Sequence, residues 1–89
     1  WGYEANSGTI VWVEIEAIDR PYLLRDATIA ISDNGGNILV AKSVTNSKRI
    51  VSLIFQLEIS DSDQLEAILK DSKNIENVFE ASRIFPGKN

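Results

Sequence analysis

The residues best placed to do chemistry lie between an alternating segment and a helical one, at Asp19-Arg20-Pro21-Tyr22. A strand that turns directly into a helix brings backbone N–H groups and the positive end of the helix dipole to one place, which favours a small anionic ligand. We therefore expect a ligand carboxylate to be held by Asp19, Arg20, Pro21, Tyr22, Leu23 and Leu24. Asn37 and Ile38, at the start of a later strand, are expected to complete the pocket, within the chain or from a neighbouring domain. The alternative is that Asp19 only caps the helix and Arg20 is solvated.

Two pairs of carboxylates are the other candidates. Glu14 and Glu16 are two residues apart on one predicted strand and so share a face, but neither a pocket nor a positive partner accompanies them. Asp61 and Asp63 suit the start of a helix, where the dipole favours acidic side chains. A metal site needs more ligands than either pair supplies. The sequence therefore predicts no metal, no cofactor and no catalytic residue.

Composition excludes several classes of protein. The 89 residues fit one domain, and the absence of cysteine and histidine removes disulfides, thiolate ligands and imidazole bases. A net charge of −4 argues against a DNA partner, although Lys48-Arg49 could touch RNA or an acidic partner. No apolar run approaches the roughly 18 residues of a membrane span, so we expect a cytoplasmic protein without a membrane partner. The chain has no Met and starts at Trp1, so we also expect it to be part of a longer protein.

Six elements must position these residues. Apolar alternation predicts strands over residues 9–18, 37–45, 49–59 and 75–85, and helical spacing predicts a helix after Pro21 and another after Asp61. Pro21 suits a first helical turn, and Asn34-Gly35-Gly36 ends that helix. Asp61 and Gln64 form a capping box. The order predicts an α+β, ferredoxin-like βαββαβ fold, which is a four-stranded antiparallel sheet with both helices on one face.

The helix-free face of this sheet is expected to be apolar. Ile10 and Trp12 alternate with the core residues of the first strand, and Val44 and Ile54 would extend the same patch. Such a surface is too apolar to leave in water, so we expect these four residues to lie in an interface. The alternative is a scatter of exposed apolar side chains, which is normal for a protein surface.

Four stretches together resemble a known family: DRPYLLRDAT, GGNILVAKSVTN, FQLEISDSDQLEAIL and NIENVFEASRIF. They resemble an ACT domain and, more narrowly, the C-terminal ACT domain of RelA/SpoT-type GTP pyrophosphokinases and guanosine tetraphosphate hydrolases. The resemblance covers residues 9–85. Its positions are Asp19-Arg20, the Leu-Leu-Arg-Asp of residues 23–26, Asn37-Ile38, Val78 with Arg83, and Trp1-Gly2 ahead of the domain.

The resemblance implies a regulatory domain over residues 9–89, preceded by the end of a linker at residues 1–8. Such a domain is not an enzyme; it would help a parent GTP pyrophosphokinase to couple amino-acid shortage to guanosine tetraphosphate synthesis or hydrolysis. The resemblance also implies a homodimer through ACT domains, an amino-acid ligand, and ribosome or tRNA contacts of the parent. Many ACT domains have Gly after Asp-Arg-Pro, where this chain has Tyr22, and the Tyr22 side chain could fill the ligand space.

Two other functions stay open at this point. One is an ACT domain that binds the end product of an amino-acid biosynthetic enzyme. The other is a small stand-alone ferredoxin-like enzyme, such as an acylphosphatase-type hydrolase. That enzyme would need a phosphate-cradling loop, and no such loop is visible in the sequence.

Overall fold

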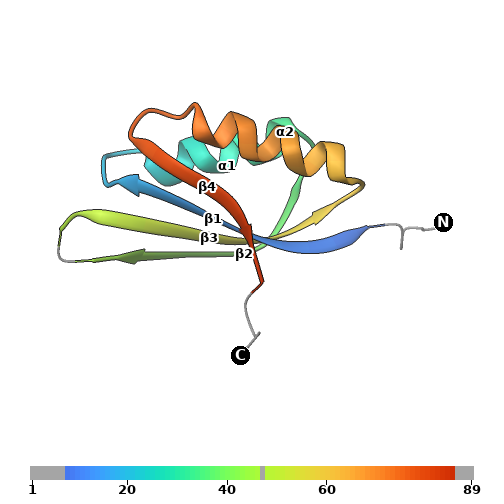
Figure 1. Ribbon diagram of the computed structural model, residues 1–89, viewed down its shortest axis with the longest axis horizontal. Coiled ribbons are helices and arrows are strands. Elements are labelled where there is room, and N and C mark those ends of the chain that lie inside the picture. Colours follow the sequence, from blue (N-terminus) through green and yellow to red (C-terminus); the bar gives the residue numbers. More distant parts are fainter. Residues whose placement is uncertain (1–7, 47, 86–89) are drawn as a thin grey trace.

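A computed structural model describes residues 8–46 and 48–85 as one layer of sheet and one layer of helices (Figure 1). The elements are β1 (Thr9–Ile18), α1 (Leu23–Asp33), β2 (Asn37–Thr45), β3 (Ile50–Ile59), α2 (Ser62–Lys73) and β4 (Val78–Ile84). The strands form one antiparallel sheet in the order β2-β3-β1-β4, and both helices cover the same face. The predicted ferredoxin-like fold is confirmed. Neither helix is long and apolar enough to cross a membrane.

The core lies between the sheet and the helices. In β1 the residues Val11, Val13, Ile15 and Ala17 are buried, as the alternation predicted, and β3 contributes every second residue from Val51 to Ile59. The helices add Leu23, Ala27 and Ile31 from α1 with Leu65 and Ile68 from α2. Each of the larger side chains in this core, from valine to phenylalanine, stabilises the fold by about 1.5–3 kcal/mol when fully buried.

Two strands are shorter than predicted because left-handed residues precede them. Arg49 has φ 66° in the turn between β2 and β3, so β3 begins at Ile50 rather than at residue 49. Asn77 has φ 79°, so β4 begins at Val78 rather than at residue 75. Ile75 is apolar, which in the sequence favours the strand. Its side chain instead packs against the core from the loop that follows α2.

The predicted start of α2 and the predicted end of α1 are both found in the structure. The Asp61 side chain accepts a hydrogen bond from Gln64 N at 2.9 Å, and the Gln64 side chain accepts one from Ser60 N at 2.6 Å, so the predicted cap of α2 is confirmed. At the end of α1, Gly35 has φ 82°, as the predicted glycine stop requires. A Cβ on Gly36 would lie 2.9 Å from the Ile31 side chain and 3.0 Å from that of Ile68, so glycine lets the chain after α1 pass close to both.

Candidate functional site

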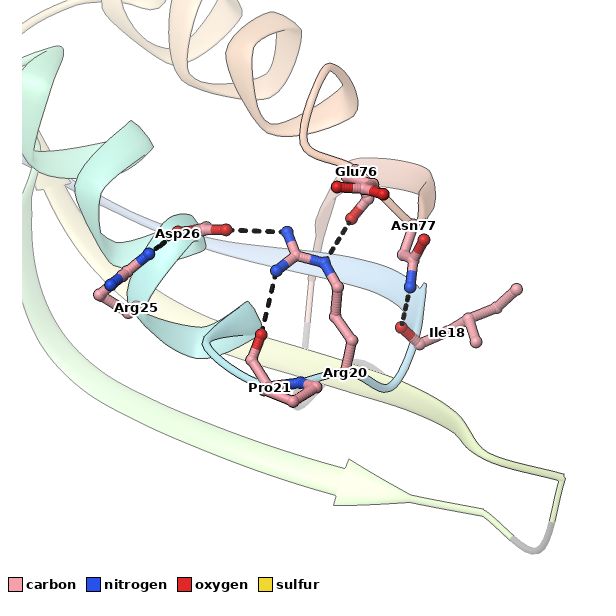
Figure 2. A network of polar contacts seen from close by, with 7 residues as sticks. All are labelled: Ile18, Arg20, Pro21, Arg25, Asp26, Glu76 and Asn77. Atoms are coloured by element: carbon pink, nitrogen blue, oxygen red, sulfur yellow. Dashed lines mark hydrogen bonds and ion pairs between the residues drawn. The ribbon is translucent and has the colours of Figure 1, made fainter.

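Arg20 is the centre of the predicted ligand turn and makes three contacts within the chain (Figure 2). Its Nη2 donates to Asp26 Oδ2 at 2.8 Å, its Nη1 to Pro21 O at 3.1 Å and its Nε to Glu76 O at 3.1 Å. The side chain is only 19% exposed. Arg20 therefore joins the turn after β1 both to α1 and to the loop before β4, and the alternative of a solvated Arg20 is wrong.

Asp26 receives two arginines. Arg25 Nη2 lies 3.2 Å from Asp26 Oδ1, while Arg20 holds the other carboxylate oxygen. The hydrogen bond from Arg20 is the main reason why the pKa of Asp26 lies below its usual value; partial burial opposes this shift and Arg25 adds to it. Asp26 therefore stays ionised, and it fixes the arginine that organises the turn.

Helix α1 begins without a side-chain cap. Its N-cap residue is Tyr22, at φ 67° and ψ 12°, and no side chain accepts a hydrogen bond there. Leu23 N donates to Arg20 O and Asp26 N to Tyr22 O, whereas the N–H groups of Leu24 and Arg25 have no acceptor among residues 8–46 and 48–85. Unpaired N–H groups at a helix start, with the dipole behind them, form the kind of place where a carboxylate binds.

The structure corrects two predicted roles in this turn. The alternative role of Asp19 was to cap α1, but its side chain is exposed and makes no hydrogen bond to any described residue. Pro21 was expected within the first helical turn, but it precedes the N-cap. The reason in both cases is the left-handed conformation of Tyr22, which makes Tyr22 the N-cap and Leu23 the first helical residue.

The Tyr22 side chain points outward. It is 67% exposed, and the Arg25 guanidinium carbon lies 4.6 Å from the centre of its ring, a cation–π contact. The left-handed backbone at this position would suit glycine better than tyrosine, because a Cβ in this conformation costs about 1–2 kcal/mol.

The turn is tied to two other loops at the same end of the sheet. Asp19 N donates to Arg49 O at 2.9 Å, and Ile18 N donates to Asn77 O at 3.0 Å. Arg49, Asn77 and Tyr22 are the described residues other than glycine with positive φ, and all three lie at this end. Sparsely populated backbone conformations gather at functional sites more often than elsewhere.

The structure does not bring Asn37 and Ile38 to the turn. Asn37 lies opposite Glu58, which lies opposite Ile10 near the start of β1, whereas the turn follows the end of β1. Nine residues of strand separate the two places, which is about 30 Å. Within one copy these residues form no common site. A shared pocket therefore needs a second copy.

A shallow cavity of about 340 Å³ lies beside the Arg20 network. Its lining combines an ion pair with aliphatic side chains: Arg20, Asp26, Ile29, Ala30, Ile75 and Glu76. Residue types alone did not reveal Glu76, which contributes a backbone oxygen. Asp26 could have been found from its place in the Leu-Leu-Arg-Asp stretch, in the first turn of α1.

The helix-free face of the sheet, here called the open face, has the composition that the alternation predicted. Trp12 lies between Gln56 and Ile84, and Glu14 between Ile54 and Ser82. On β2 the residue Val44 falls on the same face and is 57% exposed. Ile10 is 47% exposed, while Trp12 and Ile54 are partly buried by their neighbours.

Comparison with known proteins places these features in a family context. A family model described as ACT domain matches residues 6–83. A GTP pyrophosphokinase of Streptomyces antibioticus is 34% identical over 98% of this chain and 10% of its own length. The bifunctional (p)ppGpp synthase/hydrolase RelA of Mycobacterium tuberculosis is 33% identical over 94% of this chain and 11% of its own length. The chain thus spans about a tenth of the curated relatives it matches.

Solved structures show the same fold. The crystal structure of the ACT domain from GTP pyrophosphokinase of Chlorobium tepidum superposes with a TM-score of 0.75, at 17% identity, over 86% of this chain and 99% of that one. A homoserine dehydrogenase from Thiobacillus denitrificans shares the fold over 17% of its own chain, with a TM-score of 0.72 at 20% identity.

Proposed function

Because the chain belongs to the ACT domain family, we propose that it is the regulatory ACT domain of a RelA/SpoT-type GTP pyrophosphokinase and is not itself an enzyme. Support comes from a GTP pyrophosphokinase and a bifunctional (p)ppGpp synthase/hydrolase that match nearly the whole chain. The proposal includes a cytoplasmic location and ribosome or tRNA contacts of the parent. The isolated chain should transfer no pyrophosphate from ATP to GTP, and measurable transfer would contradict this part.

The domain is proposed to bind an amino acid at the turn between β1 and α1. The observation that carries this proposal is the start of α1, where the N–H groups of Leu24 and Arg25 lack acceptors among the described residues. They could receive the ligand carboxylate, and the neighbouring cavity of about 340 Å³ falls within the size range of small-molecule pockets. Binding would act on the parent by linkage, because a ligand that prefers one state shifts the population toward it.

A homodimer is proposed to complete this site. The start of β2 lies at the sheet end opposite the turn, so an antiparallel pairing of two β2 edges would bring Asn37 and Ile38 of one copy to the same end as the turn of the other. The β2 strand suits such pairing because it is an edge strand and eight of its nine residues are exposed. Ile10, Trp12 and Ile54 remain proposed as interface residues on the open face.

Amide chemical shifts test the ligand site. Titration with each of the twenty amino acids should move the signals of residues 19–24 and of residues 37–38 for at least one of them. The Asn37→Ala variant should lose this response, while Lys42→Ala, on the same strand, should keep it. No shift with any amino acid would reject the site.

Sedimentation equilibrium tests the dimer. Val44→Lys, on the β2 edge strand, should raise the dimer dissociation constant by about tenfold. Ser82→Lys, on the other edge strand, serves as the control and should not. A monomer at all concentrations would reject the homodimer.

A further inference from the structure

The open face carries an excess of negative charge that the helices do not neutralise. Strand register places four carboxylates and one lysine on it: Glu14, Glu16, Glu58, Glu80 and Lys42. Four negative charges and one positive charge leave a net −3 on this face. The ion pairs found among residues 8–46 and 48–85 all involve Asp26, so none of these carboxylates has a cationic partner there.

The charges are concentrated in one corner, defined by Glu14, Glu16 and Glu80. Glu16 and Glu80 lie directly opposite each other on neighbouring strands, and Glu14 follows on the same face. Like charges directly opposite across strands are destabilising. A cation arriving from outside the described chain would remove this repulsion.

The rest of the open face is apolar. Trp12 and Ile84 lie opposite each other next to the acidic corner, and Ile54 lies beside Glu14 on β3. Ile10 and Val40 continue the apolar part and are 47% and 37% exposed. A sheet face of this kind is normally covered by another layer of secondary structure.

We propose that the open face binds an amphipathic helix of a protein partner, with Lys or Arg side chains along one flank of its apolar stripe. This rests on the proposal that the open face is an interface, and it names the chemistry of the partner. The apolar stripe would pack on Trp12, Ile54 and Ile84, and the basic flank would meet Glu16 and Glu80.

The charge of the open face also argues against a second copy of the chain and against nucleic acid as its partner. A symmetric pairing uses the same patch of both copies, so two open faces would bring eight carboxylates together with only two lysines. Nucleic acid would place phosphates against the acidic corner, which is unfavourable. A basic helix is the partner that neutralises the corner and covers the apolar part together.

Two synthetic 18-residue helical peptides test the proposal. Both carry the same leucine stripe; one is flanked by lysines and the other by glutamates. The lysine peptide should shift the amide signals of residues 10–16, 54 and 80–84, and its binding should weaken as salt rises. The glutamate peptide should bind about tenfold more weakly or not at all.

Charge reversal provides the decisive variant. Glu16→Lys with Glu80→Lys should weaken binding of the lysine peptide by about tenfold and let the glutamate peptide bind instead. The control is Asp33→Lys with Glu66→Lys, which changes the net charge equally at exposed helix positions. Equal effects of both pairs would overturn the proposal. So would shifts outside the open face, or a dimer that Trp12→Lys abolishes, since a second copy would then cover the face.

A stability measurement gives an independent check. Glu16→Gln or Glu80→Gln should raise the melting temperature of the isolated chain by about 2 °C, because each relieves the cross-strand repulsion. Glu66→Gln on α2 should leave it unchanged. No rise in either variant would remove the electrostatic basis of the proposal. Failure with the lysine peptide, while amino acids still shift the turn at residues 19–24, would reject this partner and leave the ligand site standing.

Discussion

Replacing Tyr22 by glycine and by alanine tests the backbone conformation on which the ligand turn depends. Tyr22 has φ 67°, and its ring contacts Arg25 at 4.6 Å. Both substitutions remove the cation–π contact, but only glycine adopts this φ without strain. The comparison between the two variants therefore isolates the cost of a Cβ in the left-handed region.

The expected magnitudes follow from these features. Tyr22→Ala keeps the strain and loses the contact with Arg25, so its free energy of unfolding should fall by about 0.5–1 kcal/mol. Glycine escapes a strain of about 1–2 kcal/mol, and the greater freedom of its unfolded chain takes back about 0.4–1 kcal/mol. Tyr22→Gly should therefore be more stable than Tyr22→Ala by roughly 0.5–1 kcal/mol, which is about 2 to 8 °C in melting temperature for a domain of this size.

Urea unfolding followed by circular dichroism measures the difference. Ser32 is the matched control because it is exposed and lies within α1, where alanine should be more stable than glycine by about 1 kcal/mol. The order of the two substitutions should therefore reverse between residues 22 and 32. If alanine is at least as stable as glycine at both positions, Tyr22 is not left-handed, and the account of how α1 begins is wrong.

Three further predictions concern the interior of the site and the core. In Arg20→Lys, the single ammonium group cannot reach Asp26, Pro21 O and Glu76 O together. The amide hydrogen of Ile18, which bonds to Asn77 O in the loop that Arg20 holds, should therefore exchange about tenfold faster in the variant, while that of Phe55 should exchange at the same rate. Equal exchange rates at Ile18 in the variant and the parent chain would mean that Arg20 does not hold the loop. Since the pKa of Asp26 is lowered in the folded chain, its stabilising effect is fully present above its unfolded pKa of about 3.9 and is lost as pH falls from there through the lower folded pKa. Asp26→Asn should therefore lose less stability than the parent chain between pH 6 and pH 3, as urea midpoints at both pH values would show, and equal losses would contradict this. Ser72 is fully buried in α2, and its Oγ has no hydrogen-bond partner among the described residues. Ser72→Ala should therefore raise the free energy of unfolding by about 1 kcal/mol, and Ser32→Ala serves as the control for helix propensity. A lower free energy of unfolding in Ser72→Ala would show that the hydroxyl does have a hydrogen-bond partner.

The fold was predictable from local sequence patterns because each pattern arises from contacts of the element in which it occurs. The alternation over residues 9–18 reflects one face of β1 in the core, and its bounds match the structure. The cap of α2 was equally readable, because Asp61 and Gln64 act over three residues. The prediction failed at residues 75–77, where Ile75 packs against the core although it lies in a loop. The neighbouring residues do not distinguish such a loop from the start of a strand.

The hydrogen bonds of Arg20 were less predictable, because one of them joins residues that are far apart in the sequence and because some of the acceptors are backbone oxygens. Arg20 and Glu76 are 56 positions apart, and the acceptor is a carbonyl oxygen, which any residue would offer. The residue types therefore did not indicate that Arg20 holds the loop before β4. The left-handed conformation of Tyr22 was not predictable either, because tyrosine rarely adopts a positive φ.

The strand order also determines when the domain can fold during its own synthesis. Strand β1 is central, but its neighbours β3 and β4 begin 32 and 60 residues after it ends. At about 5–20 residues per second, the ribosome would add β3 roughly 2 to 6 s later and β4 roughly 3 to 12 s later. Until β3 is made, β1 has no neighbouring strand to pair with, and its apolar residues, among them Val13 and Ile15, have only α1 to pack against. A nascent chain paused before residue 50 should therefore offer this segment to chaperones, and one paused after β4 has emerged should not.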